Sequence, residues 1–240
     1  MQRGELSGLV LTHNGRDPRL VIQQLATVCE QVVLVNDARF GEFELNGNPP
    51  DNCELTVVER HFDNFPDQRN AGIEKALGSW VLSVDSDELL TEKLTKELAE
   101  LEPTPGAQVY ALPRTEIIKG QCLQNANLYS SYHPRLFKSS MRYAALPKIH
   151  EEFADFDYGT VVNLNYGLTH QPEENNLELI VKAFGYGQQW FGDRYSWGQV
   201  FGSIPSLMLR RGYWRDRMNG LAMASVQASF RLGTKLQRNN

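Results

Sequence analysis

The chain has 240 residues, of which 41% are hydrophobic and 22% are charged. This composition supports a sizeable core, in one large α/β domain or one domain with an appendage, and argues against global disorder. The three cysteines are far apart and form no CxxC pair, so they indicate neither a zinc knuckle nor a disulfide framework and fit a reducing, cytoplasmic compartment.

The charge is spread unevenly along the chain. The formal net charge is -5, yet residues 201–240 hold seven Lys and Arg against one Asp. We therefore expect the C-terminal tail to meet something anionic. Nucleic acid is the weaker candidate, because no recognition motif accompanies the charge. The first residues lack the apolar core of a signal peptide, and no run of about 18 apolar residues predicts a membrane-spanning helix.

The first third of the chain alternates between predicted strands and helices. Apolar runs predict strands, and apolar residues at helical spacing predict helices, between turns rich in Gly, Pro and Asn. In chain order these elements occupy residues 6–12, 19–31, 32–37, 54–60, 65–78 and 79–85. Such alternation is typical of a parallel, doubly wound sheet, in which ligands bind at the carboxyl ends of the strands.

The pattern changes after the segment of residues 91–107. A helix ends at Pro103 and Pro105, and two strand-like segments follow, at residues 108–120 and 134–140. From Pro172 the chain is predicted to be helical again, with one or two amphipathic helices between Arg210 and Leu236. We expect a catalytic domain over residues 1–171 and a helical extension over residues 172–240.

The segment "SWVLSVDSDELL" runs an apolar strand into three acids, Asp85, Asp87 and Glu88. They could form the solvated start of a helix, capped by Ser86 or Asp87. They could hold a divalent cation through oxygen ligands, because repulsion between carboxylates is costly without a cation. They could also act as a general acid and base. The rigid strand before them favours the cation.

The strand ends lack the usual phosphate-binding loops. Neither GxGxxG nor GxxxxGK[ST] follows the first strand, which disfavours a dinucleotide site and a P-loop. The stretches "THNGRD" and "NDARF" instead place small polar groups after the first two strands, where a base and a ribose could be hydrogen-bonded. A nucleotidyltransferase is less favoured, because "THNGRDPR" is a poor phosphate loop.

Four stretches together resemble a known family. "LVLTHNGRD", "VVLVND", "FPDQRNAGIEKALGSWVLSVDSDE" and "RLFKSS…LPKIHEEF" occur in the order found in family 2 glycosyltransferases, nearest to the lipopolysaccharide-core β-1,4-glucosyltransferase branch. The resemblance covers most of residues 6–153. It implies a GT-A fold: an α/β, Rossmann-like, mainly parallel central sheet flanked by helices, here with a C-terminal helical extension.

The resemblance implies a nucleotide-sugar site. Arg69 would face the diphosphate or, alternatively, be a surface helix charge; Arg135 would bind the diphosphate or acceptor or pair with an acid. Asp85 would lie near the ribose. The full set of implied nucleotide-sugar ligands is Thr12, His13, Asn14, Asn36, Asp37, Gln68, Arg69, Asn70, Asp85 and Arg135.

The resemblance also implies a cation, Mg²⁺ or Mn²⁺, that bridges the diphosphate and stabilises its departure. Asp87 would coordinate it and Glu88 would support it. His150 would be a third ligand or a diphosphate donor, against the alternative of a hydrogen-bonded loop histidine. His170 is predicted to be structural, with a metal or diphosphate contact as the alternative.

An inverting transfer needs a base that deprotonates the attacking hydroxyl. Glu151 in "LPKIHEEF" is the predicted base and Glu152 the fallback, since strand-like alternation turns only one of them inward. The predicted reaction moves a hexose from a nucleotide-diphosphate sugar to a hydroxyl of a cell-envelope glycan or glycolipid. Asn36 in place of an acid, and His133 where relatives often carry one, motivate an alternative: a catalytically degenerate, nucleotide-sugar-binding scaffold.

The tail interleaves arginines with aromatic and apolar residues. Positions 214, 218, 221, 225, 228 and 232 follow helical spacing and are mostly apolar. One interpretation is a helix packed on the catalytic domain. The other is an interfacial helix on an anionic leaflet, which would suit a lipid-linked acceptor. The expected location is cytoplasmic, with the tail as a candidate contact to the inner face of the cytoplasmic membrane.

Overall fold

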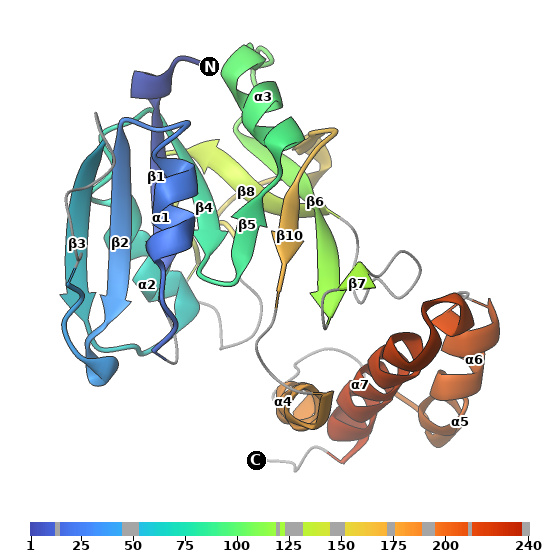
Figure 1. Cartoon of the computed structure of the whole chain (residues 1–240). Helices are drawn as coiled ribbons and strands as arrows, with labels where there is room; N and C mark the ends of the chain where they lie inside the picture. Colours follow the sequence, from blue (N-terminus) through green and yellow to red (C-terminus); the bar gives the residue numbers. More distant parts are fainter. Residues whose placement is uncertain are drawn as a thin grey trace. The chain divides into compact units, whose positions relative to one another are not determined.

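The computed structural model describes residues 1–12, 15–44, 53–118, 121–122, 132–144, 152–171, 176–188, 195–210 and 213–236. The chain divides into two compact units (Figure 1). Unit 1 comprises residues 1–114 and 131–170, and unit 2 comprises residues 115–130 and 171–240. Short 3-10 turns lie at Arg3–Glu5 (η1), Ala38–Phe40 (η2), Tyr158–Thr160 (η3) and Tyr213–Asp216 (η4).

One half of the central sheet is parallel, as the sequence predicts. Its strands lie in the order β3-β2-β1-β4, where β1 is Leu6–Leu11, β2 is Gln31–Asp37, β3 is Glu54–Arg60 and β4 is Trp80–Asp85. Each neighbouring pair runs parallel. The apolar runs of β1, β2 and β4 are buried on both faces, which is typical of a parallel sheet covered by helices.

The other half of the sheet is mostly antiparallel, with a parallel pairing of β6 and β9 as the exception among the pairings given. Its order continues β4-β8-β6-β10-β5, and β8 pairs antiparallel with both β4 and β6. The two-residue strands β7 and β9 pair with β6. These strands are Glu88–Leu90 (β5), Val109–Ile118 (β6), Gln121–Cys122 (β7), Tyr132–Lys138 (β8), Val162–Asn163 (β9) and Leu168–His170 (β10).

The helix-start interpretation of the acids is wrong. Glu88–Leu90 forms strand β5, which pairs antiparallel with β10, and helix α3 begins only at Glu92. The cap of that helix is Thr91, whose hydroxyl accepts a hydrogen bond from the amide of Leu94 at 3.2 Å. Local sequence favours a helix here, but pairing with a strand some 80 residues away decides the conformation.

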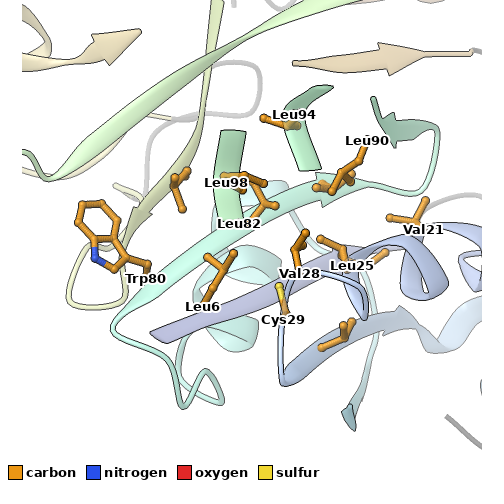
Figure 2. Packing of buried hydrophobic residues seen from close by; sticks show 14 of the residues in the cluster. Leu6, Val21, Leu25, Val28, Cys29, Trp80, Leu82, Leu90, Leu94 and Leu98 are labelled. Atoms are coloured by element: carbon orange, nitrogen blue, oxygen red, sulfur yellow. The ribbon is translucent and has the colours of Figure 1, made fainter. Parts of the chain in front are cut away.

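Helices cover both faces of the sheet in unit 1. Helix α1 (Arg19–Leu25) and helix α3 (Glu92–Glu100) pack on one face, where Leu25, Leu94 and Leu98 meet Leu82 and other strand residues (Figure 2). Helix α2 (Phe65–Ile73) contributes Ile73 to the core on the other face. The prediction of an α/β fold with a mainly parallel central sheet, flanking helices and a C-terminal helical part is confirmed.

Helix α2 packs unusually close to the sheet. A Cβ at Gly72 would lie 2.3 Å from Leu9 Cδ1 and 2.8 Å from Val35 Cγ2. Real Cβ atoms do not approach so closely, so only glycine lets this helix reach the sheet. The last turn of α2 is thereby held against the strands.

The regular elements described in unit 2 are helices, apart from the end of β6 and β7. Tyr213 and Met223 are among its fully buried residues. Its longest helix, α7, crosses α4 at two glycines: a Cβ at Gly233 would lie 2.2 Å from the carbonyl oxygen of Phe184 and 3.0 Å from Cα of Gly187. The helices are Asn176–Gln188 (α4), Trp197–Phe201 (α5), Ser203–Arg210 (α6) and Arg217–Lys235 (α7).

The predicted apolar stripe of the tail is not the face that α7 buries. Met223, Ala224 and Val226 lie in the core of unit 2, whereas Leu221 of the predicted stripe is exposed. Within the described ranges, no helix combines the length and the apolar character that crossing a membrane requires.

Candidate functional site

The parallel strands end side by side. In the strand register, Leu11 of β1 pairs with Val35 of β2 and with Asp85 of β4. Thr12, Asn36 and Asp85 therefore lie along one edge of the sheet, as the doubly wound pattern predicts.

A hydrogen-bonded chain links the ends of β1 and β2. The Thr12 hydroxyl donates to Asn36 Oδ1 at 2.9 Å and accepts from the amide of Asp37 at 2.9 Å. The Asn36 amide donates to Glu59 Oε2 at 2.7 Å and to the carbonyl oxygen of Gly41 at 2.8 Å. These two side chains are buried, and their polar groups fix the rim of the site.

Asp37 is a buried, ionised carboxylate. The Arg39 guanidinium donates to both of its oxygens, and the backbone amides of Arg39 and Phe62 donate to Oδ1. The hydrogen bond from Arg39 outweighs burial and lowers the pKa of Asp37 below its ordinary value of 3.8. Asp37 thus ends β2 with a fixed negative charge.

Three consecutive residues of α2 bind three different segments. The Gln68 amide donates to the carbonyl oxygen of His61, just after β3, at 3.0 Å. Arg69 donates to Asp85 Oδ1 at 2.8 Å and to the Ser83 hydroxyl at 2.6 Å, both on β4.

The third of these residues, Asn70, binds the backbone of Tyr143. Its Nδ2 donates to the Tyr143 carbonyl oxygen, and its Oδ1 accepts from the Tyr143 amide, both at 2.9 Å.

The guanidinium group of Arg69 is buried, with 2% of the residue exposed. This burial excludes the alternative interpretation of Arg69 as a surface helix charge.

Asp85 and Glu88 share Arg135. Nη2 of Arg135 lies 2.7 Å from Asp85 Oδ2 and 2.6 Å from Glu88 Oε1. Glu88 is fully buried. Its Oε1 also accepts a hydrogen bond from Arg114 at 3.3 Å, and its Oε2 accepts one from the backbone amide of Asp85 at 3.1 Å. Arg135 therefore pairs with acids, as one of the two sequence interpretations expected, while Glu88 serves as the inner support of the cluster.

The environment keeps Asp85 ionised. Burial by itself would raise the pKa of Asp85, but the charges of Arg135 and Arg69 and their hydrogen bonds outweigh it. The pKa consequently lies far below the usual carboxylate range. The Asp85 side chain is 29% exposed, so its oxygens, each with a second lone pair, remain open to a ligand.

Asp87 has different partners from Asp85. Its Oδ2 lies 2.7 Å from Arg16 Nη1 and 3.1 Å from His170 Nε2. Burial would raise the pKa of Asp87 and Asp85 opposes its charge, but the hydrogen bond and charge of His170, with Arg16, lower the pKa overall. Asp85 and Asp87 thus have separate, fixed environments.

Sequence reasoning missed Arg16. It follows Gly15, whose φ of +71° makes the turn after β1 that glycine favours. The only sequence signal was its place in "THNGRD", at the end of the first strand. His170 reaches the site because β10 pairs with β5, placing His170 opposite Glu88. Its contact with Asp87 was not predicted from the sequence.

The donors fit a divalent cation held by few protein ligands. Asp87 and His170 supply a carboxylate oxygen and an imidazole nitrogen on adjoining strand ends, a set that Mg²⁺ or Mn²⁺ could use with substrate oxygens and water. Among the described residues, no group of three or more His, Cys, Asp or Glu could hold a metal.

Some predicted site residues lie outside the described part of the chain: His13, Asn14, His150 and Glu151. Glu152 is described and exposed, and its carbonyl oxygen accepts from the Ala144 amide at 2.7 Å. Residues 142–144 thus pair with residues 152–154, and Glu152, one of the two candidate bases, lies within this pairing.

No protein-family model matches the chain, and no curated protein matches it. Among solved structures, S. aureus TarS 1–349 in complex with UDP-GlcNAc is 13% identical with a TM-score of 0.46, over 97% of this chain and 92% of that one. The longer S. aureus TarS is 13% identical with a TM-score of 0.44, over 91% of this chain and 44% of that one.

The mannosyltransferase PcManGT from Pyrobaculum calidifontis, in complex with GDP-Man and Mn²⁺, is 14% identical with a TM-score of 0.45, over 99% of this chain and 77% of that one. Identities of 13–14% with TM-scores below 0.5 transfer no function to this chain. The function proposed below therefore rests on the chain's own residues.

Proposed function

We propose that the chain is a metal-dependent, inverting glycosyltransferase of the GT-A type. It would transfer a hexose from a nucleotide-diphosphate sugar to a hydroxyl of a cell-envelope glycan or glycolipid. The observation that carries this proposal is that the two acids after β4 have different partners. Asp85 is paired with Arg69 and Arg135. Asp87 is paired with Arg16 and lies beside His170.

The donor nucleotide would bind along the carboxyl ends of β1, β2 and β4. Asp85 can still accept a hydrogen bond from a ribose hydroxyl, because its carboxylate has more lone pairs than the hydrogen bonds from its two arginines use. The guanidinium groups of Arg69, Arg114 and Arg135 gather beside Asp85 and Glu88. Guanidinium groups at this edge of the sheet favour binding of an anionic diphosphate nearby.

Asp87 and His170 would hold Mg²⁺ or Mn²⁺, which stabilises the negative charge of the leaving diphosphate. Arg16, beside Asp87, adds a second cationic group on the same side. Glu151, or Glu152 in its place, would accept the proton of the attacking hydroxyl as that oxygen bonds to the anomeric carbon. One direct displacement inverts the anomeric centre without a covalent sugar–protein intermediate.

Thermal-shift measurements with a panel of nucleotide-diphosphate sugars, each with and without Mn²⁺, test the donor and cation together. A ligand that binds the folded state raises the melting temperature by mass action. We expect one nucleotide to give a shift that requires Mn²⁺, and Asp87→Ala to lose this shift and transfer while remaining folded. Full transfer by Asp87→Ala with EDTA present would overturn the cation assignment. Binding without transfer across a broad acceptor panel would instead support the scaffold alternative.

We further propose that unit 2 contacts an anionic membrane surface, on the inner face of the cytoplasmic membrane, where a lipid-linked acceptor would lie. Unit 2 holds ten Lys and Arg against six Asp and Glu, within a chain of net charge -5. The supporting surface, here called the aromatic–cation patch, consists of Tyr195, Trp197, Phe201, Arg231 and Lys235.

The Trp197 and Phe201 rings of the aromatic–cation patch are exposed, and the Tyr195 side chain is partly buried. Phe201 is 75% exposed and stacks on Trp197, with ring centroids 5.7 Å apart. Lys235 Nζ lies 5.6 Å from the Trp197 ring, and Arg231 lies 5.1 Å from the Tyr195 ring. Exposed aromatic rings beside cations suit the headgroup region of an anionic leaflet. This location replaces the stripe that the tail sequence suggested.

A further inference from the structure

We propose that Asn70 is a positioning residue, which holds the backbone of Glu152, one of the two candidate bases, in a fixed place relative to Asp85. The inference rests on the proposed function, because it assigns the base to Glu151 or Glu152. It concerns a residue that the sequence resemblance placed beside the nucleotide.

The side chain of Asn70 binds the backbone of Tyr143 through one donated and one accepted hydrogen bond, as the backbone of a neighbouring strand does. Its amide nitrogen donates to the Tyr143 carbonyl oxygen and its amide oxygen accepts from the Tyr143 amide, each at 2.9 Å. Only a carboxamide offers one donor and one acceptor in this arrangement; a carboxylate can only accept, and so would face the Tyr143 carbonyl oxygen with a second acceptor. The position therefore requires asparagine rather than aspartate.

Tyr143 in turn anchors the two sides of the base-bearing segment. It forms an antiparallel bridge with Phe153, flanked by bonds from the Ala144 amide to the Glu152 carbonyl oxygen at 2.7 Å and from the Ala154 amide to the Arg142 carbonyl oxygen at 2.9 Å. The Tyr143 and Phe153 rings stack with centroids 4.5 Å apart. A shift of Tyr143 would therefore move the backbone of Glu152.

The preceding residue, Arg69, ties the same helical turn to the other side of the site. Its guanidinium bonds Asp85 Oδ1 at 2.8 Å and lies 5.8 Å from the centre of the Tyr143 ring. Gly72, one turn further along, keeps this helix against β1 and β2. One turn of α2 thus links Asp85 to Tyr143 and, through Tyr143, to the backbone of Glu152. Such positioning governs rate strongly, because about 1 Å of misplacement can cost roughly 100-fold.

Kinetics of the full-length Asn70→Asp and Asn70→Ala variants test this role. We expect kcat to fall by about 10- to 100-fold while the donor KM changes less than about threefold, since the donor-side contacts remain. Amide hydrogen exchange supplies a second readout. Exchange at Tyr143, Ala144 and Ala154 should accelerate by about tenfold or more, while exchange at Leu82 and Val84 of β4 should not change.

Asn64→Ala is the matched control on the same helix. Asn64 caps the N-terminus of α2 by accepting from the Asp67 amide at 2.9 Å, so its loss also weakens the helix, without touching Tyr143. Its kcat should stay within about twofold of wild type. An equal loss of kcat in Asn64→Ala, or an unchanged kcat in Asn70→Asp, would overturn the positioning role.

The two proposals fail differently. A wild-type chain without transferase activity overturns the proposed function and, with it, the catalytic consequence of Asn70. Unchanged exchange at Tyr143 and Ala144 in the Asn70 variants overturns the anchoring itself, whatever the activity.

Discussion

Nη1 of Arg16 lies 2.7 Å from Oδ2 of Asp87, the oxygen that also faces His170. The carboxylate that we propose as a ligand of the divalent cation is thus already paired with a guanidinium group. Because both positive groups need the same oxygen, Arg16 should compete with the cation for Asp87 when the donor is absent.

Replacing Arg16 with Gln should therefore tighten binding of Mn²⁺ alone by roughly three- to tenfold, the range expected for loss of one partly buried ion pair. Titration of free Mn²⁺ by electron paramagnetic resonance measures the change without any turnover. Arg19→Gln removes the neighbouring exposed pair with Asp17 and serves as the control. Weaker or unchanged Mn²⁺ binding in Arg16→Gln would contradict the competition.

Replacing Arg135 with Met should strongly destabilise the fold. Arg135 is 6% exposed and bonds both Asp85 and Glu88, so its removal leaves buried carboxylates short of a cation. Breaking such a buried pair costs about 3–5 kcal/mol, which urea unfolding measures. Arg142→Met, which loses bonds from an exposed side chain to backbone carbonyls, should cost less than about 1 kcal/mol. Similar losses in the two variants would count against the cluster as a stabilising unit.

The Asp37 carboxylate should contribute to stability in a pH-dependent way. Its pKa is lowered in the folded state, chiefly by Arg39, so its contribution is present above the ordinary value of 3.8 and is lost as the pH falls through the lowered pKa. The difference in unfolding free energy between wild type and Asp37→Asn should be steady from neutral pH down to about pH 5 and shrink below about pH 4. Urea unfolding at a series of pH values provides the comparison.

Asp17 offers a charge-matched control for Asp37. It pairs with Arg19 at the same sequence spacing, but its side chain is 60% exposed, against 1% for Asp37. Solvent screening should make the effect of Asp17→Asn smaller at every pH. A wild-type advantage over Asp37→Asn that grows as the pH falls would refute the sign of this argument.

Adding one methyl group at Gly72 should weaken packing of α2 on the sheet. The new Cβ would overlap Leu9 and Val35, and overpacking of this kind costs about 1–3 kcal/mol. Gly185→Ala, where the added Cβ meets nothing within 4 Å, should be neutral or stabilise α4 by up to about 1 kcal/mol. Chemical unfolding of the two variants decides the matter; equal effects would mean that the close approach at Gly72 is unimportant.

The aromatic–cation patch should bind anionic vesicles. We expect the double variant Trp197→Ser, Phe201→Ser to bind phosphatidylglycerol-containing vesicles about tenfold more weakly than wild type, because exposed rings insert among headgroups. Vesicle sedimentation, with purely phosphatidylcholine vesicles for comparison, is the measurement. Tyr166→Ser removes an exposed ring beside Lys93 in unit 1 and should leave binding unchanged. Equal binding to neutral and anionic vesicles would argue against a role for the cations.

Much of unit 1 follows from local sequence pattern. The apolar runs predicted the four parallel strands, and helical spacing predicted the helices between them, because each pattern reflects burial on a sheet or along a helix stripe. The order of strands and helices also placed Thr12, Asn36 and Asp85 at one edge. These expectations are confirmed, because parallel strands joined by helices must end on the same side.

The partners of those residues were not predictable from local pattern. His170 reaches Asp87 through antiparallel pairing of β10 with β5, Asn70 reaches Tyr143 across 73 residues, and Arg16 reaches Asp87 from the turn after β1. Such contacts depend on register and burial set by distant segments, which no local period encodes.

The sequence by itself determined the four parallel strands, the helices between them and the edge of the sheet that carries the acids, because hydrophobic periodicity is a local property of the chain. The tertiary structure alone decided the partners of each acid. Asp85 pairs with Arg69 and Arg135, and Asp87 lies beside His170 and Arg16. Glu88 is fully buried. That division depends on long-range packing, which brings charges together where their separation and burial set the interaction.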